Sequence, residues 1–259
     1  MTTASIKVAE SPLVLYALRR ADDALILGHR VSEWCGHAPM LEEDMALANI
    51  GLDLIGQARE LYTYAAKVEN AGNDEDKFAY LRDVRQYRNL LLVEQPNGDF
   101  AVTIAKQFLY DAWHFHVLHA LSSSSNERIA AIAAKGLKEV TYHLRRSSEW
   151  MQRLGDGTDE SHARMLAAIP QVWRFTVELC NADEVEQRLS AEGVAPNPQE
   201  LAAAWKAKVA DIFAAATLPL PEPAVNFYLS GRRGLHTEHL GILLAEMQFL
   251  QRAYPDATW

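Results

Sequence analysis

Two successive stretches between residues 98 and 155 carry acidic and imidazole side chains where a buried helix would present apolar ones. Asp111 and His114 share one helical face in the first stretch, and Glu139 and His143 share one in the second, because residues three and four apart lie on the same side of a helix. The neighbours on both faces are largely apolar. Carboxylates turned inward from two antiparallel helices are how a four-helix bundle builds a metal site.

Two further acids lie on helices predicted earlier in the chain, so that each of four helices offers one carboxylate. The four acids are Asp23, Asp53, Asp111 and Glu139. A di-iron or di-manganese bundle also needs a histidine three residues after two of its carboxylates. Here Gly56 follows Asp53 and Tyr142 follows Glu139 at that distance. Neither glycine nor a neutral phenol replaces imidazole as a ligand, so the pattern indicates the outline of a metal site without its two histidines.

Two other interpretations of these residues stay open at this point. The acids can be ordinary solvent-facing residues of amphipathic helices. Alternatively, Asp111, His114, Glu139 and His143 can together hold a single metal ion on adjacent helices, which would make the chain a metal-dependent oxidase. Elemental analysis for bound metal would separate these interpretations.

The elements that must position these residues are long helices, as expected for an all-α protein. Several helix starts are marked by a capping residue that precedes a proline or a long apolar pattern. The loops between the predicted helices are short, which favours antiparallel packing of successive helices. The predicted helices of the bundle cover residues 12–34, 41–68, 99–121 and 126–154, and further helices cover 75–88, 159–180, 182–191, 198–216 and 235–254. We predict an extended segment at residues 90–93, a disordered N-terminus over residues 1–10 and a single domain over residues 11–259.

Composition excludes several classes of function. The chain has 259 residues, a formal net charge of -9 and 49% hydrophobic residues, which favours a large core and argues against binding to nucleic acid or an anionic membrane. We find no apolar run long enough to span a bilayer and no secretory signal at the N-terminus, so we expect a cytoplasmic protein. The two cysteines, Cys35 and Cys180, form no metal-binding pair in the sequence.

Four segments carry a resemblance to a known family. These segments are Trp34–Pro39, Leu47–Leu54, Leu91–Gly98 and Gly234–Leu240. In them, and over the chain from about residue 11 onward, the sequence resembles the structural C subunits of bacterial ring-1,2-phenylacetyl-CoA epoxidases, the multicomponent monooxygenases of phenylacetate degradation.

The resemblance implies a ferritin-like four-helix bundle with additional C-terminal helices and a non-catalytic role for this chain. It also implies a homologous catalytic partner that carries the di-iron centre, a reductase component in the same complex, and no cofactor in the chain itself. The positions that would correspond to the metal ligands are Asp23, Asp53, Gly56, Asp111, Glu139 and Tyr142. His143 lies one residue beyond the expected ligand position, about 100° further round the helix, and we hypothesise that it helps to neutralise the acids.

Three functions follow as hypotheses. The first is a structural subunit that pairs with and stabilises the catalytic subunit, and that can form a homodimer when it is alone. The second is the metal-dependent oxidase described above. The third is a helical binding module with no part in oxygen chemistry.

Overall fold

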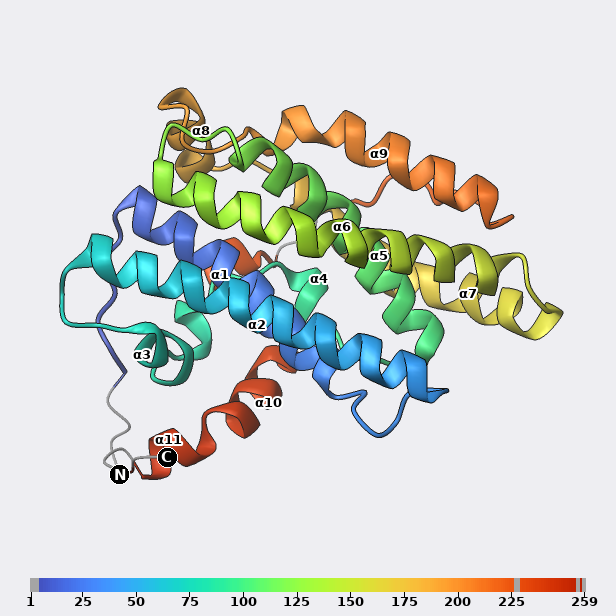
Figure 1. Cartoon of the computed structure of the whole chain (residues 1–259), viewed down its shortest axis with the longest axis horizontal. Coiled ribbons are helices and arrows are strands. Elements are labelled where there is room, and N and C mark those ends of the chain that lie inside the picture. The colour runs from blue at the N-terminus through green and yellow to red at the C-terminus, as the bar shows by residue number, and fades with distance from the viewer. Residues whose placement is uncertain (1–4, 226–228, 255–256, 258–259) are drawn as a thin grey trace.

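The computed structural model describes residues 5–225, 229–254 and 257, and these residues are almost entirely helical or in connecting loops (Figure 1). The α-helices are α1 (Pro12–Ser32), α2 (Leu41–Glu69), α3 (Glu75–Tyr80), α4 (Leu91–Glu94), α5 (Phe100–Leu121), α6 (Glu127–Gly155), α7 (Asp159–Trp173), α8 (Glu184–Ala191), α9 (Pro198–Ala215), α10 (Glu238–Met247) and α11 (Phe249–Ala253). Three 3₁₀ helices, η1 (Val84–Gln86), η2 (Arg174–Cys180) and η3 (Gly231–Arg233), join them. In the described ranges the only β-type pairing is an isolated bridge between Ser230 and Leu235. The predicted all-α class is confirmed.

The four longest helices, α1, α2, α5 and α6, form the ferritin-like bundle that the sequence predicts. Their start positions follow the capping chemistry of the sequence. Asp99 accepts a hydrogen bond from the backbone N–H of Val102 at 3.0 Å, and Asn126 accepts one from Ile129 at 3.2 Å. Each cap satisfies a backbone donor that has no partner inside the helix, which fixes where α5 and α6 begin.

Helix α5 is the central element of the molecule. Most of its residues are buried, including the polar Lys106, Gln107 and Asp111, because α4, α6, α7 and α9 all pack against it. Helix α2 lies on the near side of the bundle in Figure 1 and buries one face only. Polar residues of α5 therefore need partners inside the protein, whereas those of α2 can reach water.

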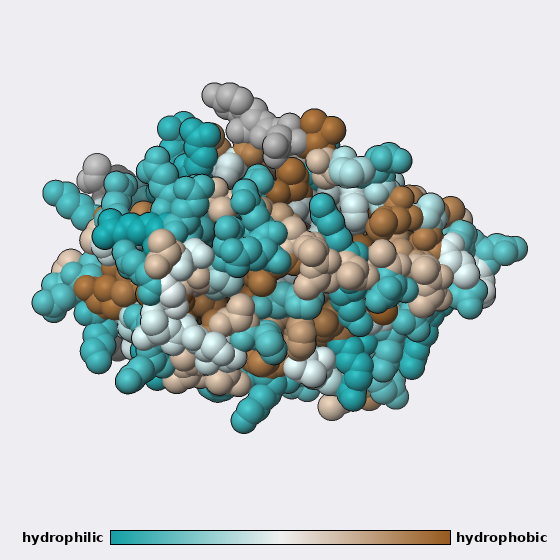
Figure 2. Space-filling view, turned by 90° about the horizontal axis from the view of Figure 1, so that it is seen from above, coloured by the Kyte–Doolittle hydropathy of each residue, from teal (hydrophilic) through white to brown (hydrophobic). Residues whose placement is uncertain are grey.

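The C-terminal third of the chain wraps around the bundle. Helices α7 and α9 pack against α5 and α6, as Figure 1 shows in yellow and orange. Helix α7 continues through Pro170 and then tightens into η2, since proline removes one backbone donor and disturbs the α-helical ladder. Seen from the side of α8 and α9, apolar residues form separate groups among hydrophilic ones (Figure 2).

Three local predictions are wrong. Residues 91–94 form one helical turn and not an extended segment. The helix predicted over residues 75–88 ends at Tyr80 and is followed by η1. The last helix starts only at Glu238, because the preceding His236 and Thr237 bind Glu94. It is also interrupted at Gln248.

The N-terminus is described from residue 5. Residues 5–10 form no helix or strand; Gln86 donates to the carbonyl of Ile6 at 2.8 Å, and the N–H of Ala9 donates to Glu69 at 2.6 Å. Disorder of residues 1–10 stays a prediction. Residues 1–4 of the predicted disordered segment lie outside the described residues. The single domain over residues 11–259 stays a prediction.

Candidate functional site

Asp23 on α1 is buried and fully engaged by the C-terminal part of the chain. Arg232 of η3 forms a two-point ion pair with it, with Nη2 at 2.7 Å from Oδ2 and Nη1 at 3.0 Å from Oδ1. The backbone N–H of Leu90 donates to the same carboxylate at 2.7 Å. Among the described residues, no hydrogen bond or ion pair joins Asp23 to the other three predicted acids. Asp23 therefore acts as an anchor for η3 in this structure.

Asp53 and Glu139 lie across the contact between α2 and α6. The imidazole Nε2 of His143 lies 3.0 Å from Asp53 Oδ2, and Gln57 Nε2 donates to Glu139 Oε2 at 2.8 Å. His143 is buried, whereas the Asp53 side chain keeps 37% of its surface exposed. Each acid thus has a partner on the neighbouring helix, and both sit near the rim of the bundle interior.

Asp111 on α5 lies deeper than Asp53 and Glu139. Ser147 Oγ donates to its Oδ2 at 2.8 Å. Burial raises the pKa of Asp111 to about 6, and His143, the Ser147 hydrogen bond and Arg146 oppose that shift. The raised pKa shows that the interior only partly compensates a negative charge at this position.

His114 follows Asp111 by one helical turn but has a different partner. Its Nδ1 lies 2.7 Å from the hydroxyl of Tyr110 on the same helix. Burial, together with the nearby Arg20 and His143, lowers the pKa of His114 to about 3. The imidazole is therefore neutral at ordinary pH and tied to a phenol.

The two positions at which a metal-binding bundle would carry histidine do not face the interior here. The Tyr142 side chain is 42% exposed, and a Cβ added to Gly56 would meet no atom within 4 Å. The residues one position further along, Gln57 and His143, are buried instead. On α6, sequence spacing places His143 on the same face as Glu139, whereas on α2 it does not show whether Gly56 or Gln57 faces the interior.

Sequence patterns did not reveal two buried arginines. Arg20 of α1 has its guanidinium carbon 4.7 Å from the centre of the Trp113 ring, and it borders a cavity of about 20 Å³ together with Gln57 and His114. Arg146 of α6 forms an ion pair with Glu43 of α2. In the sequence Arg20 follows Arg19 and Arg146 follows Arg145, so no local pattern distinguishes these buried arginines from exposed ones.

A metal centre in a helical bundle needs several carboxylate and imidazole side chains close together. Within the described part of the chain, no three side chains of histidine, cysteine, aspartate or glutamate lie close enough together to hold a metal ion. The residues proposed for an independent oxidase, Asp111, His114, Glu139 and His143, therefore do not form a ligand set in this structure. The same holds for the four acids that the resemblance would place at a metal centre.

A second polar cluster joins two of the segments that carry the family resemblance. Glu94 is fully buried, and its carboxylate accepts hydrogen bonds from the backbone and hydroxyl of Thr237, both at 2.7 Å. His236 Nδ1 lies 2.8 Å from the same carboxylate. A Cβ at Gly231 would lie 1.8 Å from the carbonyl oxygen of Asn89, so only glycine permits this close approach. The cluster therefore joins the segment around Glu94 to that around His236.

Comparison with known proteins agrees with the resemblance that these segments carry. The model of the family described as phenylacetic acid catabolic protein matches residues 1–259. The chain belongs to this family. It is 53% identical over 247 residues to the C subunit of the 1,2-phenylacetyl-CoA epoxidase of Escherichia coli (strain K12), and the match covers 95% of this chain and 99% of that protein.

The match to the phenylacetic acid catabolic family confirms the resemblance deduced from the four sequence segments. It extends over the bundle and the C-terminal helices alike, since nearly the whole of both chains is covered. Over the stretches that the structure describes, we find no helix that is long and apolar enough to cross a membrane.

Proposed function

We propose that this chain is a non-catalytic structural subunit of a 1,2-phenylacetyl-CoA epoxidase that works in the cytoplasm in aerobic phenylacetate breakdown. In this role it pairs with a homologous di-iron catalytic subunit, stabilises it and contributes to the surface that the reductase component meets. The similarity to the C subunit of the Escherichia coli epoxidase supports the assignment to such a complex.

The observation that carries the non-catalytic part of this proposal is the state of the four acids. Each carboxylate is engaged by a group of the protein itself. The pairs are Asp23 with Arg232, Asp53 with His143, Asp111 with Ser147, and Glu139 with Gln57. A di-iron centre needs carboxylates that converge on one point with free lone pairs, whereas these are spread over separate pairs.

Internal cations also occupy the region between the helices. Arg20 and Arg146 bring positive charge into the bundle without any metal, and Arg146 lies 3.4 Å from Gln107 Oε1 as well as pairing with Glu43. Bringing a divalent ion next to a buried guanidinium costs electrostatic free energy, because like charges repel strongly at low dielectric. We infer that the bundle keeps the ferritin-like architecture while using arginine and histidine to balance its acids.

Burial supports a specific assignment of the register. We infer that Gln57 and His143, and not Gly56 and Tyr142, occupy the interior positions at which the catalytic relatives would carry histidine. One imidazole then remains, 3.0 Å from Asp53, and within the described residues it belongs to no group of three or more possible metal ligands. A lone imidazole with one carboxylate is a weak ligand set for iron.

The exposed apolar residues of α2 support a role in an assembly. Leu41, Met45 and Leu52 are 71%, 59% and 68% exposed, and their spacing places them on one face of the helix. Exposed apolar stripes of this kind mark contacts with other protein surfaces. We propose that this face of α2 meets the catalytic subunit, and that it also supports homodimers of the isolated chain.

The test is to produce this chain alone, the catalytic subunit alone, and both together. We expect the isolated chain to contain no stoichiometric iron and to leave phenylacetyl-CoA unchanged, and the pair to contain iron and to epoxidise it in the presence of the reductase. Iron bound stoichiometrically by the isolated chain, with oxygen consumption, would instead support the oxidase hypothesis. Lack of any complex with the catalytic subunit would support an unrelated binding module.

A further inference from the structure

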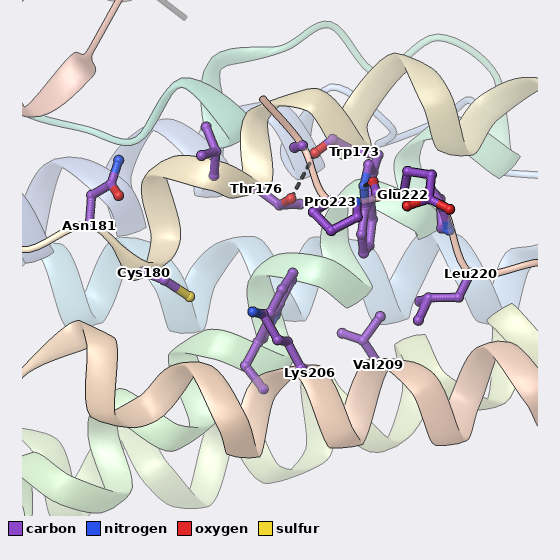
Figure 3. A pocket seen from close by; sticks show the side chains of 13 residues that line it. Trp173, Thr176, Cys180, Asn181, Lys206, Val209, Leu220, Glu222 and Pro223 are labelled. Carbon is purple, nitrogen blue, oxygen red and sulfur yellow. Dashed lines mark hydrogen bonds between the residues drawn. The ribbon is translucent and has the colours of Figure 1, made fainter. Parts of the chain in front are cut away.

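A pocket separate from the bundle interior lies between η2, α9 and the segment that follows α9 (Figure 3). Its volume is about 520 Å³, within the range of sites that hold small organic molecules. In Figure 3 the side chains of Lys206 and Val209 rise from α9 toward η2 and toward the segment that carries Leu220 and Glu222. None of the residues discussed for the bundle interior lines this pocket.

Two tryptophans form one wall of the pocket, and both rings are fixed in place. Trp173 and Trp205 are stacked, with ring centres 6.0 Å apart and planes inclined by 24°. The indole N–H of Trp205 donates to the carbonyl of Leu109 at 3.0 Å, and that of Trp173 donates to the carbonyl of Glu222 at 2.8 Å. Because both N–H groups are already used, the indoles offer the pocket apolar surface and no free donor. Trp205 is only 4% exposed and Trp173 is half-buried, so Trp173 supplies most of that surface.

The pocket carries few polar side chains, which are Lys206, Glu222, Asn181 and Thr176. Lys206 is exposed, and in the described part of the chain it makes no ion pair or hydrogen bond. Burial raises the pKa of the neighbouring Cys180 thiol, so that this side chain contributes a neutral, apolar wall. The one acid that lines the pocket, Glu222, has an exposed side chain. Lys206 is therefore the positive charge that a ligand in this pocket would meet.

We propose that this pocket binds a small planar aromatic anion, with its ring against the Trp173–Trp205 wall and its acidic group at Lys206. The stacked indoles favour a flat aromatic ring over an aliphatic chain of similar size, since aromatic pairs gain more than their buried area alone provides. The Lys206 ammonium favours a carboxylate or sulfonate over a neutral group, because hydrogen bonds between ionised partners are the stronger ones. This site does not depend on whether the chain is catalytic.

The test uses 1-naphthoate as the probe and isothermal titration calorimetry on the full chain. We expect 1-naphthoate to bind, and its neutral analogue 1-naphthamide and the aliphatic anion octanoate to bind at least about fivefold more weakly, as expected when a charged hydrogen bond or an aromatic contact is lost. Lys206→Gln should weaken naphthoate binding by a similar factor and leave naphthamide binding unchanged. The matched control is Lys208→Gln on the same helix, which should leave both affinities unchanged because Lys208 does not line the pocket.

A second variant tests the position of the site. Val177→Trp places a large ring in the pocket from η2, where Val177 is only partly buried, and it should abolish naphthoate binding. Circular dichroism and the unfolding temperature check that each variant is folded, and the Lys206 and Lys208 pair decides the question if Val177→Trp does not fold. The proposal is overturned by any one of three results. These are absence of naphthoate binding up to about 10 mM, equal affinity for octanoate, or an equal effect of the Lys206 and Lys208 substitutions.

Discussion

Lys106 shows how a charged residue is accommodated in the middle of this fold. The ammonium group is completely buried on α5, where it donates to the carbonyl of Gln95 at 2.6 Å and to Asn97 Oδ1 at 3.0 Å. Burial, together with Arg30, lowers its pKa to about 7, and Glu33 opposes the shift. Its two acceptors are neutral, so nothing in direct contact balances the positive charge.

This pKa gives stability a specific dependence on pH. The unfolded chain holds the Lys106 proton up to the ordinary value near 10.5, whereas the folded chain loses it above about 7. Between these values the unfolded state binds more protons, so the contribution of Lys106 to the unfolding free energy rises with pH, by up to about 1.4 kcal/mol per pH unit. Below pH 7 the contribution is constant. We expect Lys106→Met to remove this rise, measured by urea unfolding at pH 7, 8 and 9.

The matched control for Lys106→Met is the exposed Lys138 of α6. Lys138→Met should lower or raise stability equally at every pH in this range, because an exposed ammonium group is solvated by water in the folded and the unfolded chain alike. Equal pH slopes for the natural protein and Lys106→Met would show that the buried lysine keeps its proton throughout.

At the scale of elements, α1 is connected to the C-terminal part of the chain through charge. The Asp23–Arg232 pair joins the middle of α1 to η3, and both side chains are almost fully removed from solvent. Arg19, on the same helix, pairs with Asp183 and Glu186 of the segment around α8. Residues more than 160 positions apart are therefore held together by buried and partly buried ion pairs.

We expect Arg232→Met to be strongly destabilising, because it leaves the Asp23 carboxylate buried without its main counter-charge. The expected loss is on the order of 3–5 kcal/mol, measured by chemical unfolding at pH 7. The neighbouring Arg233 is exposed, so Arg233→Met should change stability by no more than about 0.5 kcal/mol. Adding Asp23→Leu to Arg232→Met should recover much of the loss, since the unpaired charge is then gone. If Arg232→Met with Asp23→Leu is as unstable as Arg232→Met alone, Arg232 stabilises the fold by packing and not by its charge.

The elements also show what local sequence patterns could and could not predict. The long helices α1, α2, α5 and α6 were predictable within a few residues, because caps, prolines and apolar periodicity are local signals. The turn at Leu91–Glu94 was not, because its partners are distant: the N–H of Leu91 donates to Glu178 and the carbonyl of Glu94 accepts from Arg30. An apolar run of four residues looks the same whether it is extended or helical.

The candidate site was predictable only in part for the same reason. Asp111 and His114 were correctly placed on a buried face of α5, since nearly every side of that helix is covered. On α2 and α6, one face is open, and a shift of one residue exchanges a buried position for an exposed one, as Tyr142 and His143 show. The main partner of Asp23 is Arg232, 209 residues away, which no spacing argument could have found.

At the scale of the whole molecule, the exposed apolar stripe on α2 is the surface through which we propose that the chain binds other proteins. Leu52 is 68% exposed at the middle of this helix, and it is followed by the open position of Gly56. A second protein surface can approach closely there, because no side chain rises above the backbone at Gly56. Under the proposed function, this surface belongs to the catalytic partner.

We expect Leu52→Glu to weaken association with the catalytic partner by at least about tenfold, because it places a charge in an apolar contact that excludes water. The measurement is light scattering with size-exclusion chromatography of the co-expressed pair, together with the mass of the isolated chain, whose homodimer should dissociate in the same variant. Leu166→Glu on α7 is the control: Leu166 is 40% exposed but lies on another helix, so this variant should associate normally. Both substitutions sit on exposed helix positions, so the unfolding temperature of the isolated chain should hardly change. A Leu52→Glu variant that still forms the complex as tightly as the natural chain would place the partner on another face of the molecule, such as the one that carries Ile242 and Phe249.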